Sequence, residues 1–426
     1  MAKTCVYPRK STAGRAVTCS FASPGFIRPV LALCLVAGTV LSIYLSVTKP
    51  PLRASTGTTI VTLSPEDRPQ PPKVESPSVV VMDAVSGEIL MEKNARERRA
   101  PASLTKIMTL VLALEAVAEG RAKLTDEAVT SENAWEMGGT EVWAEPGEAM
   151  TLDEWLKAIA VGSANDASVV VAEFLAGDEG AFVSMMNEKA KALGMTDTNF
   201  KNAHGLDEEG HYTTAMDMAI LSRHAVGVPH LLDYTRIYQQ EFRGGRNLLT
   251  NFNKLVYLYD GCDGLKTGYT AKSGYCVVAT AKREGSRFIV VLMGAASPDQ
   301  RMNETWKLLD WAFANFRSVK LASRGEVVCS ARVLRGTKDE VPLVAPDDVG
   351  VTVLKRERGE VSRKIRVSPL MAPVEEGAPV GEMDIFVDGK HTLTVKLVAA
   401  DSVPKAGFLH HFLRYVKVLV TGRLPR

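Results

Sequence analysis

Three short groups of polar residues could together carry nucleophilic chemistry. In chain order they are Ser103-Leu104-Thr105-Lys106, Ser163-Ala164-Asn165 and Lys266-Thr267-Gly268. A serine becomes an effective nucleophile when a neighbouring base takes its proton, and a lysine can be that base while its amine is neutral. The set therefore predicts one active site assembled from three distant segments, in which Ser103 attacks and Lys106 accepts the proton.

Each group by itself is a weak signal. A second S-x-x-K stands at 46–49, and a second S-x-N stands at 131–133. The first ends an apolar stretch and the second lies in a polar, turn-like segment, so neither has a useful setting. Standing alone, Ser103 and Lys106 would be interpreted as a helix-start serine and a solvated lysine. Their surroundings decide between this interpretation and a catalytic one.

The residues around Ser103 predict a helix. Pro101 is suited to a first helical turn. Apolar residues follow at helical spacing, namely Ile107, Leu110, Val111, Leu114 and Val117. On such a helix Ser103 and Lys106 share one face, with Cβ atoms about 5 to 6 Å apart. The unpaired backbone N–H groups at the helix start can stabilise the oxyanion that forms when the serine attacks a carbonyl. To act near neutral pH, Lys106 needs a pKa below about 10.4, which burial and a nearby cation such as Lys266 would cause.

The second group interrupts two apolar helical segments. Residues 152–161 are apolar at helical spacing, and the pattern resumes over 167–175. In one interpretation Ser163, Asn165 and Asp166 form a capping turn at the break. In the other, Ser163 relays a proton towards a leaving amine while Asn165 holds a substrate amide. The two interpretations are compatible.

The third group precedes two strand-like runs. Residues 274–281 and 288–293 are typical of neighbouring buried strands joined by a turn at 283–285. A Lys-Thr-Gly start to the first of these strands would place a fixed positive charge and a hydroxyl along its edge. Gly268 would let a substrate backbone approach closely, so that an extended peptide could pair with the edge.

With their flanking residues, these motifs resemble the low-molecular-mass penicillin-binding proteins that are serine D-alanyl-D-alanine carboxypeptidases. S-x-x-K and K-T-G are signatures of β-lactamases and penicillin-binding proteins. The resemblance runs from about 79 to 316 and is carried by residues 101–109, 162–167, 204–207 and 263–270. It implies an α/β (α+β) catalytic domain of the β-lactamase/transpeptidase type, with an antiparallel sheet and helices, followed by a small all-β domain.

Position by position, the resemblance also assigns roles. It implies catalytic residues Ser103, Lys106, Ser163 and Asn165, and substrate-binding residues Lys266, Thr267, Gly268 and Arg301. Lys266, Thr267 and Arg301 would hold the substrate's terminal carboxylate. The oxyanion hole would be the backbone N–H groups of Ser103 and Tyr269. As bare chemistry, Arg301 could equally be a surface salt-bridge partner of Glu304.

The implied reaction is acyl transfer in two steps. Ser103 attacks the carbonyl of the penultimate D-alanine of a peptidoglycan stem peptide and releases the terminal D-alanine, and water then hydrolyses the acyl-enzyme. A β-lactam offers a strained amide and a carboxylate in similar places, so penicillins are expected to acylate Ser103. The scheme requires no cofactor and no metal, and the sequence has no H-E-x-x-H or paired-cysteine motif.

Other functions were weighed against this one. A β-lactamase or a D,D-endopeptidase would use the same site, although the sequence has no convincing Glu-containing loop of the class A β-lactamase kind. A non-catalytic wall-binding protein would be expected to lack Ser103, Lys106 or Lys266, and all three are present. The seven histidines form no recognisable triad, and His204 is expected to fix a loop. The formal net charge of +2 gives no case for nucleic acid binding.

The amino-terminal region predicts export. Basic residues precede an apolar stretch at 29–47, so residues 1–47 are expected to be a cytoplasmic tail with a signal peptide or signal anchor. Cleavage and retention are both open. A Pro-rich linker follows at 48–78 and leads to the catalytic domain at 79–317. The resemblance places this domain at the extracytoplasmic face of a bacterial cell membrane.

The carboxyl-terminal region predicts a second domain at 318–403. Short alternating runs at 326–334, 349–355 and 361–367, and a pair at 383–387 and 391–397 around Asp388-Gly389, are typical of β-strands. Residues 404–426 have an apolar and a basic helical face, which favours a helix on an anionic membrane surface over one docked on its own domain. Beyond the amino-terminal region remain Cys262, Cys276 and Cys329, an odd set that argues against a disulfide framework.

Overall fold

The computed structural model describes residues 68–357 and 359–407 of the 426-residue chain. The predicted signal segment at 1–47, most of the linker and most of the terminal amphipathic helix therefore lie outside the described residues. Within the described ranges, no helix is both long enough and apolar enough to cross a membrane.

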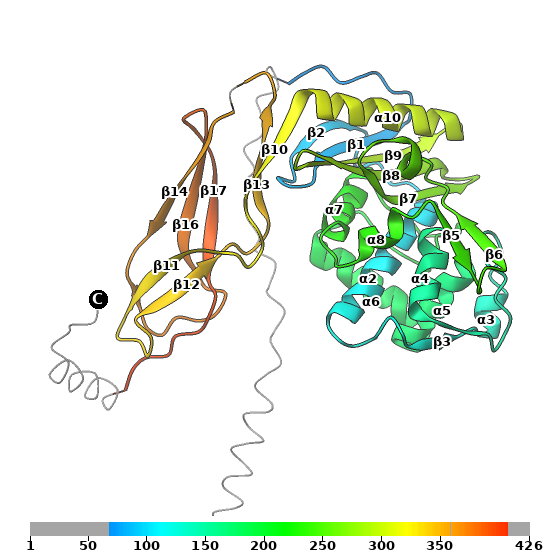
Figure 1. Ribbon diagram of the computed structural model, residues 1–426, viewed down its shortest axis with the longest axis horizontal. Helices are drawn as coiled ribbons and strands as arrows, with labels where there is room; N and C mark the ends of the chain where they lie inside the picture. The colour runs from blue at the N-terminus through cyan, green and yellow to red at the C-terminus, as the bar shows by residue number, and fades with distance from the viewer. Residues whose placement is uncertain (1–67, 358, 408–426) are drawn as a thin grey trace, which may run out of the picture. The chain divides into compact units, whose positions relative to one another are not determined.

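A five-stranded antiparallel sheet is the centre of the catalytic domain (Figure 1). Its strand order is β2-β1-β9-β8-β7, so β7 and β2 are its edges. The strands are β1 (Ser78–Asp83), β2 (Ile89–Lys93), β7 (Cys262–Thr270), β8 (Gly274–Arg283) and β9 (Ser286–Ala295). The predicted pair at 274–281 and 288–293 is confirmed as β8 and β9, with the turn at 283–285 between them.

Helices cover both faces of this sheet, as Figure 1 shows. On one face lies α10 (Pro298–Asn315). On the other lie α2 (Lys106–Ala118), α4 (Leu152–Ala160), α5 (Asn165–Ala176), α6 (Glu179–Leu193), α7 (Ala215–Ala225) and α8 (Leu231–Thr235). Successive residues of β1 enter different cores, since Val80 packs with the larger helical group and Val81 packs on the α10 side. A strand covered on both faces needs apolar residues throughout, which explains the unbroken apolar runs of β1, β8 and β9.

Small elements complete the domain around the helical group. They are β3 (Glu127–Val129), α3 (Glu132–Trp135), β4 (Ala149–Thr151), β5 (Gln239–Phe242), β6 (Asn247–Thr250) and α9 (Leu255–Leu258). β3 pairs with β4, and β5 pairs with β6 in a hairpin. Ser131, the serine of the second S-x-N, accepts a hydrogen bond from the backbone N–H of Ala134 at the start of α3, and so has a capping role.

One strand assignment from the sequence was wrong. Lys266, Thr267 and Gly268 do not start β8 but lie within β7, a separate strand at the sheet edge. β7 is poor in strand-forming residues because it contains two glycines, Gly264 and Gly268. Pairing along the length of β8, rather than intrinsic propensity, makes it a strand.

The second domain is all-β, so the expected fold class is confirmed. β10 (Phe316–Ala322) pairs with β13 (Val349–Leu354), and a six-stranded sheet has the order β14-β16-β17-β12-β11-β15. Its strands are β11 (Val327–Leu334), β12 (Glu340–Val344), β14 (Val361–Val367), β15 (Leu370–Met371), β16 (Pro379–Val387) and β17 (Lys390–Ala399). β10, β12 and β15 were not predicted. β12 is short and carries Pro342, which weakened its alternating signal.

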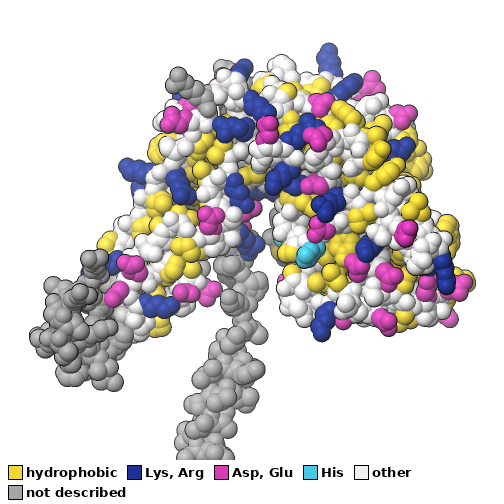
Figure 2. All heavy atoms as spheres, viewed as in Figure 1, with side chains coloured by type: hydrophobic (Ala, Val, Ile, Leu, Met, Phe, Trp, Pro, Cys, Tyr) yellow, Lys and Arg dark blue, Asp and Glu magenta, His cyan; other side chains and the backbone are white. Residues whose placement is uncertain are grey.

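Acidic and basic side chains are interspersed on the face of the molecule shown in Figure 2. This mixture agrees with the near-neutral formal charge of +2. Cys262, Cys276 and Cys329 are free thiols, and Cys276 is buried in β8 as predicted.

Candidate active site

Ser103 lies in a single turn of 3₁₀-helix, Ala102–Thr105, and α2 begins only at Lys106. We expected a regular α-helix from Pro101, but its first turn is the tighter 3₁₀ form. Ala102 has a φ of 50°, a left-handed conformation that costs a non-glycine residue about 1 kcal/mol. In a 3₁₀-turn residues three apart lie above one another, and Lys106 Nζ is 3.3 Å from Ser103 Oγ. The predicted adjacency of the two side chains is confirmed.

Two carbonyl oxygens hold the amine of Lys106. The side chain is fully buried, and Nζ donates to Asn165 Oδ1 at 2.6 Å and to the His204 carbonyl at 2.6 Å. A neutral amine has two N–H bonds and one lone pair. With both N–H bonds given to carbonyls, the lone pair is left for the remaining neighbour, the hydroxyl of Ser103. This geometry suits a general base.

Burial sets the electrostatics of both lysines. It lowers the pKa of Lys106 well below its ordinary value, and the positive charge of Lys266 lowers it further, while Asp166 acts in the opposite direction. Burial, followed by the charge of Arg301, lowers the pKa of Lys266 to about 7. In this enclosed position the charged form of the Lys266 amine is disfavoured, so its positive charge depends on pH.

The Ser163 group does not form the expected capping turn. Ala164 is the N-cap of α5 and makes no side-chain cap bond. The Asp166 carboxylate instead accepts the backbone N–H groups of Val142 and Ala144 at 3.1 Å. Asn165 donates from Nδ2 to the Gly138 carbonyl at 2.8 Å while its Oδ1 holds Lys106. The first turn of α5 thus fixes both the neighbouring loop and the buried Lys106.

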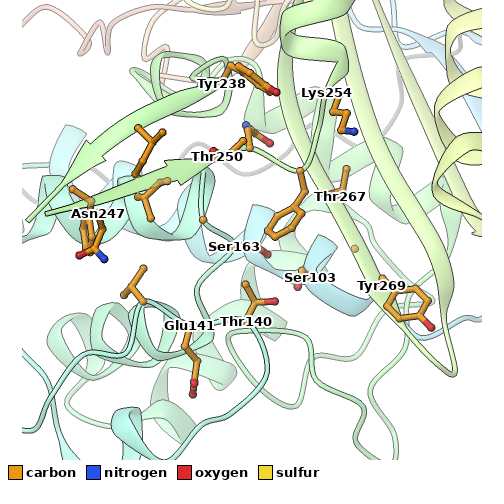
Figure 3. Close-up of a pocket in the computed structure, with 18 of the residues that line it drawn as sticks. Ser103, Thr140, Glu141, Ser163, Tyr238, Asn247, Thr250, Lys254, Thr267 and Tyr269 are labelled. Atoms are coloured by element: carbon orange, nitrogen blue, oxygen red, sulfur yellow. The ribbon is translucent and has the colours of Figure 1, made fainter. Parts of the chain in front are cut away.

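Ser163 itself remains available to a substrate. Its φ of 59° turns the backbone sharply between α4 and α5. Among the residues that the structure describes, its hydroxyl has no hydrogen-bond partner. Figure 3 shows Ser163 beside Ser103 in the same cavity.

Glycines allow other segments to pack against the nucleophile's turn. Gly205, with a φ of 95°, lies so close that a Cβ atom there would overlap the backbone carbonyl of Ala102. A Cβ atom on Gly268 would be 3.0 Å from the backbone nitrogen of Ser103. Next to Gly205, His204 accepts the N–H of Leu206 on Nδ1, and burial lowers the pKa of His204 to about 3. A neutral, loop-fixing His204 agrees with the sequence expectation.

These residues open onto a cavity of about 770 Å³. Ser103, Ser163, Thr267, Gly268 and Tyr269 line its floor and one side. The opposite wall is largely apolar and comes from the β5–β6 hairpin, the residues that flank it and the loop between α3 and β4, through Val142, Trp143, Tyr238, Phe242, Leu248, Leu249 and Phe252. Figure 3 shows the hairpin across the cavity from Tyr269.

Arg243 joins the two parts of the apolar wall. Nη1 donates to the Val142 carbonyl at 2.6 Å, and the guanidinium forms an ion pair with Glu148 at 2.6 Å. Trp143 is left 75% exposed at the rim. The sequence analysis missed these wall residues, although Gly244-Gly245 between β5 and β6 is a recognisable hairpin signal.

Arg301 faces the cavity and not Glu304. It lines the cavity together with Thr267, and its Nη1 donates to the Cys276 carbonyl at 3.4 Å. The carboxylate of Glu304 accepts from Glu75 N at 2.7 Å and from Gln300 Nε2 at 3.1 Å. The surface salt bridge between Arg301 and Glu304 is therefore excluded in this structure, and Arg301 is free to meet a substrate anion.

Comparisons with known proteins agree with this geometry. The family described as D-alanyl-D-alanine carboxypeptidase matches residues 66–297, and the family described as penicillin-binding protein 5, C-terminal domain, matches residues 316–405. The carboxypeptidase DacF of Bacillus subtilis is 39% identical over 79% of this chain and 87% of its own.

Solved structures of penicillin-binding proteins are also similar to this chain. Penicillin-binding protein 5 of Haemophilus influenzae is similar with a TM-score of 0.67 and 32% identity, covering 79% of this chain and 99% of its own. Penicillin-binding protein D2 of Listeria monocytogenes, in ampicillin-bound and cefotaxime-bound forms, has a TM-score of 0.53 and 31% identity, covering 57% of this chain and 100% of its own.

Replacing Gly205 by alanine should displace the nucleophile's turn. The added methyl group would overlap the Ala102 carbonyl, so we expect Gly205→Ala to cost about 2 to 4 kcal/mol in the free energy of unfolding. Gly177→Ala is the matched control, because Gly177 has a similar φ of 88° but open space around it. Urea unfolding should separate the two variants by more than 1 kcal/mol, and equal losses would contradict the close-approach argument.

Removing the buried charge at Lys266 should stabilise the fold while disabling the site. At pH 7 the unfolded lysine, with a pKa near 10.4, is protonated, whereas the folded one with a pKa of about 7 is only half protonated. The contribution of Lys266 to wild-type stability therefore rises with pH up to about 10.4. We expect Lys266→Met to gain about 1 to 2 kcal/mol at pH 7, with the gain shrinking towards pH 10.

Thermal unfolding measured at several pH values tests this. Lys307→Met, at an exposed position on α10, is the control and should show no pH-dependent gain. A constant gain for Lys266→Met at every pH would show that the buried amine has no lowered pKa.

Proposed function

This chain belongs to the D-alanyl-D-alanine carboxypeptidase family, and we propose that it removes the terminal D-alanine of peptidoglycan stem peptides through an acyl-enzyme on Ser103. The observation that carries the proposal is the fully buried amine of Lys106, held by two carbonyl oxygens at 3.3 Å from Ser103 Oγ, where burial lowers its pKa. A binding protein without catalysis would have no need to bury an amine in this way.

Acylation follows from the geometry. Ser103 Oγ attacks the carbonyl carbon of the penultimate D-alanine, and its proton passes to Lys106 Nζ. The backbone N–H groups of Ser103 and Tyr269 would stabilise the oxyanion. As the C–N bond breaks, the proton passes from Lys106 through the Ser163 hydroxyl to the departing amine, and D-alanine leaves.

Deacylation uses the same base. Water attacks the ester carbonyl, Lys106 takes the water proton, and collapse of the intermediate returns a proton to Ser103 Oγ as the shortened peptide leaves. A class A β-lactamase uses a glutamate to activate this water. Glu141 lines the cavity, but in Figure 3 its carboxylate points away from Ser103, and it accepts the backbone N–H of Gly138. This arrangement favours slow hydrolysis of a penicilloyl ester.

The two ends of the cavity differ in charge, and this difference sets the direction in which a peptide would bind. Lys266, Thr267 and Arg301 form the end that would hold the terminal carboxylate. The apolar wall would contact the remainder of the stem peptide. β-Lactams carry a carboxylate next to a strained amide, and we propose that they occupy the same positions and acylate Ser103.

We also propose that the enzyme acts outside the cytoplasm at the bacterial membrane. The supports are the basic and apolar pattern of residues 1–47 and the amphipathic pattern of residues 404–426, with the catalytic and β domains between them.

Loss of Ser103 should abolish both reactions. We expect Ser103→Ala, as the full chain in detergent, to release D-alanine from diacyl-Lys-D-Ala-D-Ala at least about 1,000-fold more slowly than wild type and to lose covalent labelling by a fluorescent penicillin. Ser131→Ala, at the serine that caps α3, should keep both activities. Labelling without D-alanine release in the wild type would instead indicate an endopeptidase or a stalled binder.

Membrane attachment should have two separable contributions, one from the amino-terminal segment and one from the carboxyl-terminal helix. The full chain is expected to float with vesicles containing anionic lipid, and removal of residues 408–426 should weaken binding at low salt. A retained amino-terminal anchor would resist extraction by alkaline carbonate, whereas a surface helix would not. If the full chain stays in the soluble fraction at low salt, the proposed attachment is wrong.

A further inference from the structure

A short segment between β6 and α9 is fixed by two buried asparagines. Asn251 Nδ2 donates to the Thr235 carbonyl at 3.2 Å and to the Ile237 carbonyl at 3.0 Å. Its Oδ1 accepts the N–H of Asn253 at 2.8 Å, and Asn253 Nδ2 donates to the Gly264 carbonyl in β7 at 3.1 Å. The backbone of this segment is thereby tied to the strand that carries Lys266 and Thr267.

Because Asn251 and Asn253 point into the protein, the alternate residues face outwards. Phe252 and Lys254 are both exposed, and both line the active-site cavity. Lys254 also lines a smaller adjoining pocket of about 60 Å³, together with Thr267 and Arg301. Figure 3 shows the amine of Lys254 extending towards Thr267.

The smaller pocket has the chemistry of an anion subsite. Two cationic side chains, one hydroxyl and one carboxylate, that of Asp299, border it, so its lining keeps a net positive charge; apolar atoms of Leu255, Val277 and Met302 complete it. In the part of the chain that the structure describes, the Lys254 amine has no hydrogen-bond or ion-pair partner. The Thr267 hydroxyl likewise has none. A carboxylate accepts several hydrogen bonds on its two oxygens, so it would satisfy these free donors at once.

We propose that Lys254 is a substrate-binding residue that selects a free C-terminal carboxylate, acting with Thr267 and Arg301. This inference rests on the proposed function, since it concerns the same cleft. A pocket of about 60 Å³ has room for a carboxylate, and the Lys254 amine is matched in charge only where the peptide chain ends in one. Lys254 therefore favours substrates whose chain ends there.

The test compares charged and uncharged ligands on matched variants. Lys254→Gln removes the charge, Lys254→Arg keeps it, and Lys272→Gln removes an equivalent exposed charge from the β7–β8 turn, outside both pockets. The peptide diacyl-Lys-D-Ala-D-Ala is compared with its C-terminal amide. Benzylpenicillin is compared with its methyl ester in acylation-rate measurements.

For Lys254→Gln we expect kcat/KM on the free acid to fall about threefold to tenfold, mostly through KM, with less than a twofold change on the amide. The rate of acylation by benzylpenicillin should fall by a similar factor, and that by its methyl ester should not. Lys254→Arg and Lys272→Gln should stay within about twofold of wild type on every ligand.

Equal losses on the acid and the amide, or equal losses in Lys254→Gln and Lys272→Gln, would overturn the assignment. So would an unchanged free-acid reaction in Lys254→Gln. If wild type takes up penicillin but releases no D-alanine, the proposed function fails instead. The comparison of benzylpenicillin with its ester still decides the role of Lys254 in that case.

Discussion

The candidate active site depends on burying one amine inside the protein. Lys106 is buried beside Ser103, and two carbonyl oxygens from different segments take its N–H bonds. Removing a lysine from water disfavours its charged form, and the charge of Lys266 adds to this effect. In the proposed mechanism the base is therefore prepared before substrate binds. The surrounding structure holds Lys106, Asn165 and His204 at these distances.

The arrangement of the active-site residues costs folding free energy, and the hydrophobic cores around it offset that cost. Ala102 has a left-handed backbone, two lysines are buried, and several hydroxyls are left for a ligand. Such features persist only where their surroundings over-determine them. The sheet supplies this rigidity because apolar side chains on both of its faces enter separate cores, one against the helical group and one against α10. Most of the stabilising apolar contacts therefore lie away from the cleft, and they offset the cost of the strained, reactive groups within it.

The sequence predicted the motifs better than their environment. Ser103 and Lys106 could be paired because helical spacing brings residues three apart together in either an α-turn or a 3₁₀-turn, so the error in helix type did no harm. The assignment of Lys266 to the wrong strand arose because β7 is defined by pairing with β8 and not by its own composition. The pKa of about 7 at Lys266, the direction of Arg301 and the wall tied by Arg243 depend on tertiary burial and long-range contacts, which local patterns do not encode.

The unequal ends of the cavity determine how a peptide must lie. A carboxylate placed against Val142, Phe242 and Leu248 would lose water at an apolar surface, which costs several kcal/mol for a charged group, and Arg243 in this wall is already paired with Glu148. At the opposite end, Thr267 and Arg301 offer donors on and beside the edge strand β7, which an extended peptide can pair with. In the proposed mechanism, a carboxylate held there would bring the amide bond one residue away to Ser103, and the position of the cations would select which bond of the peptide is cut.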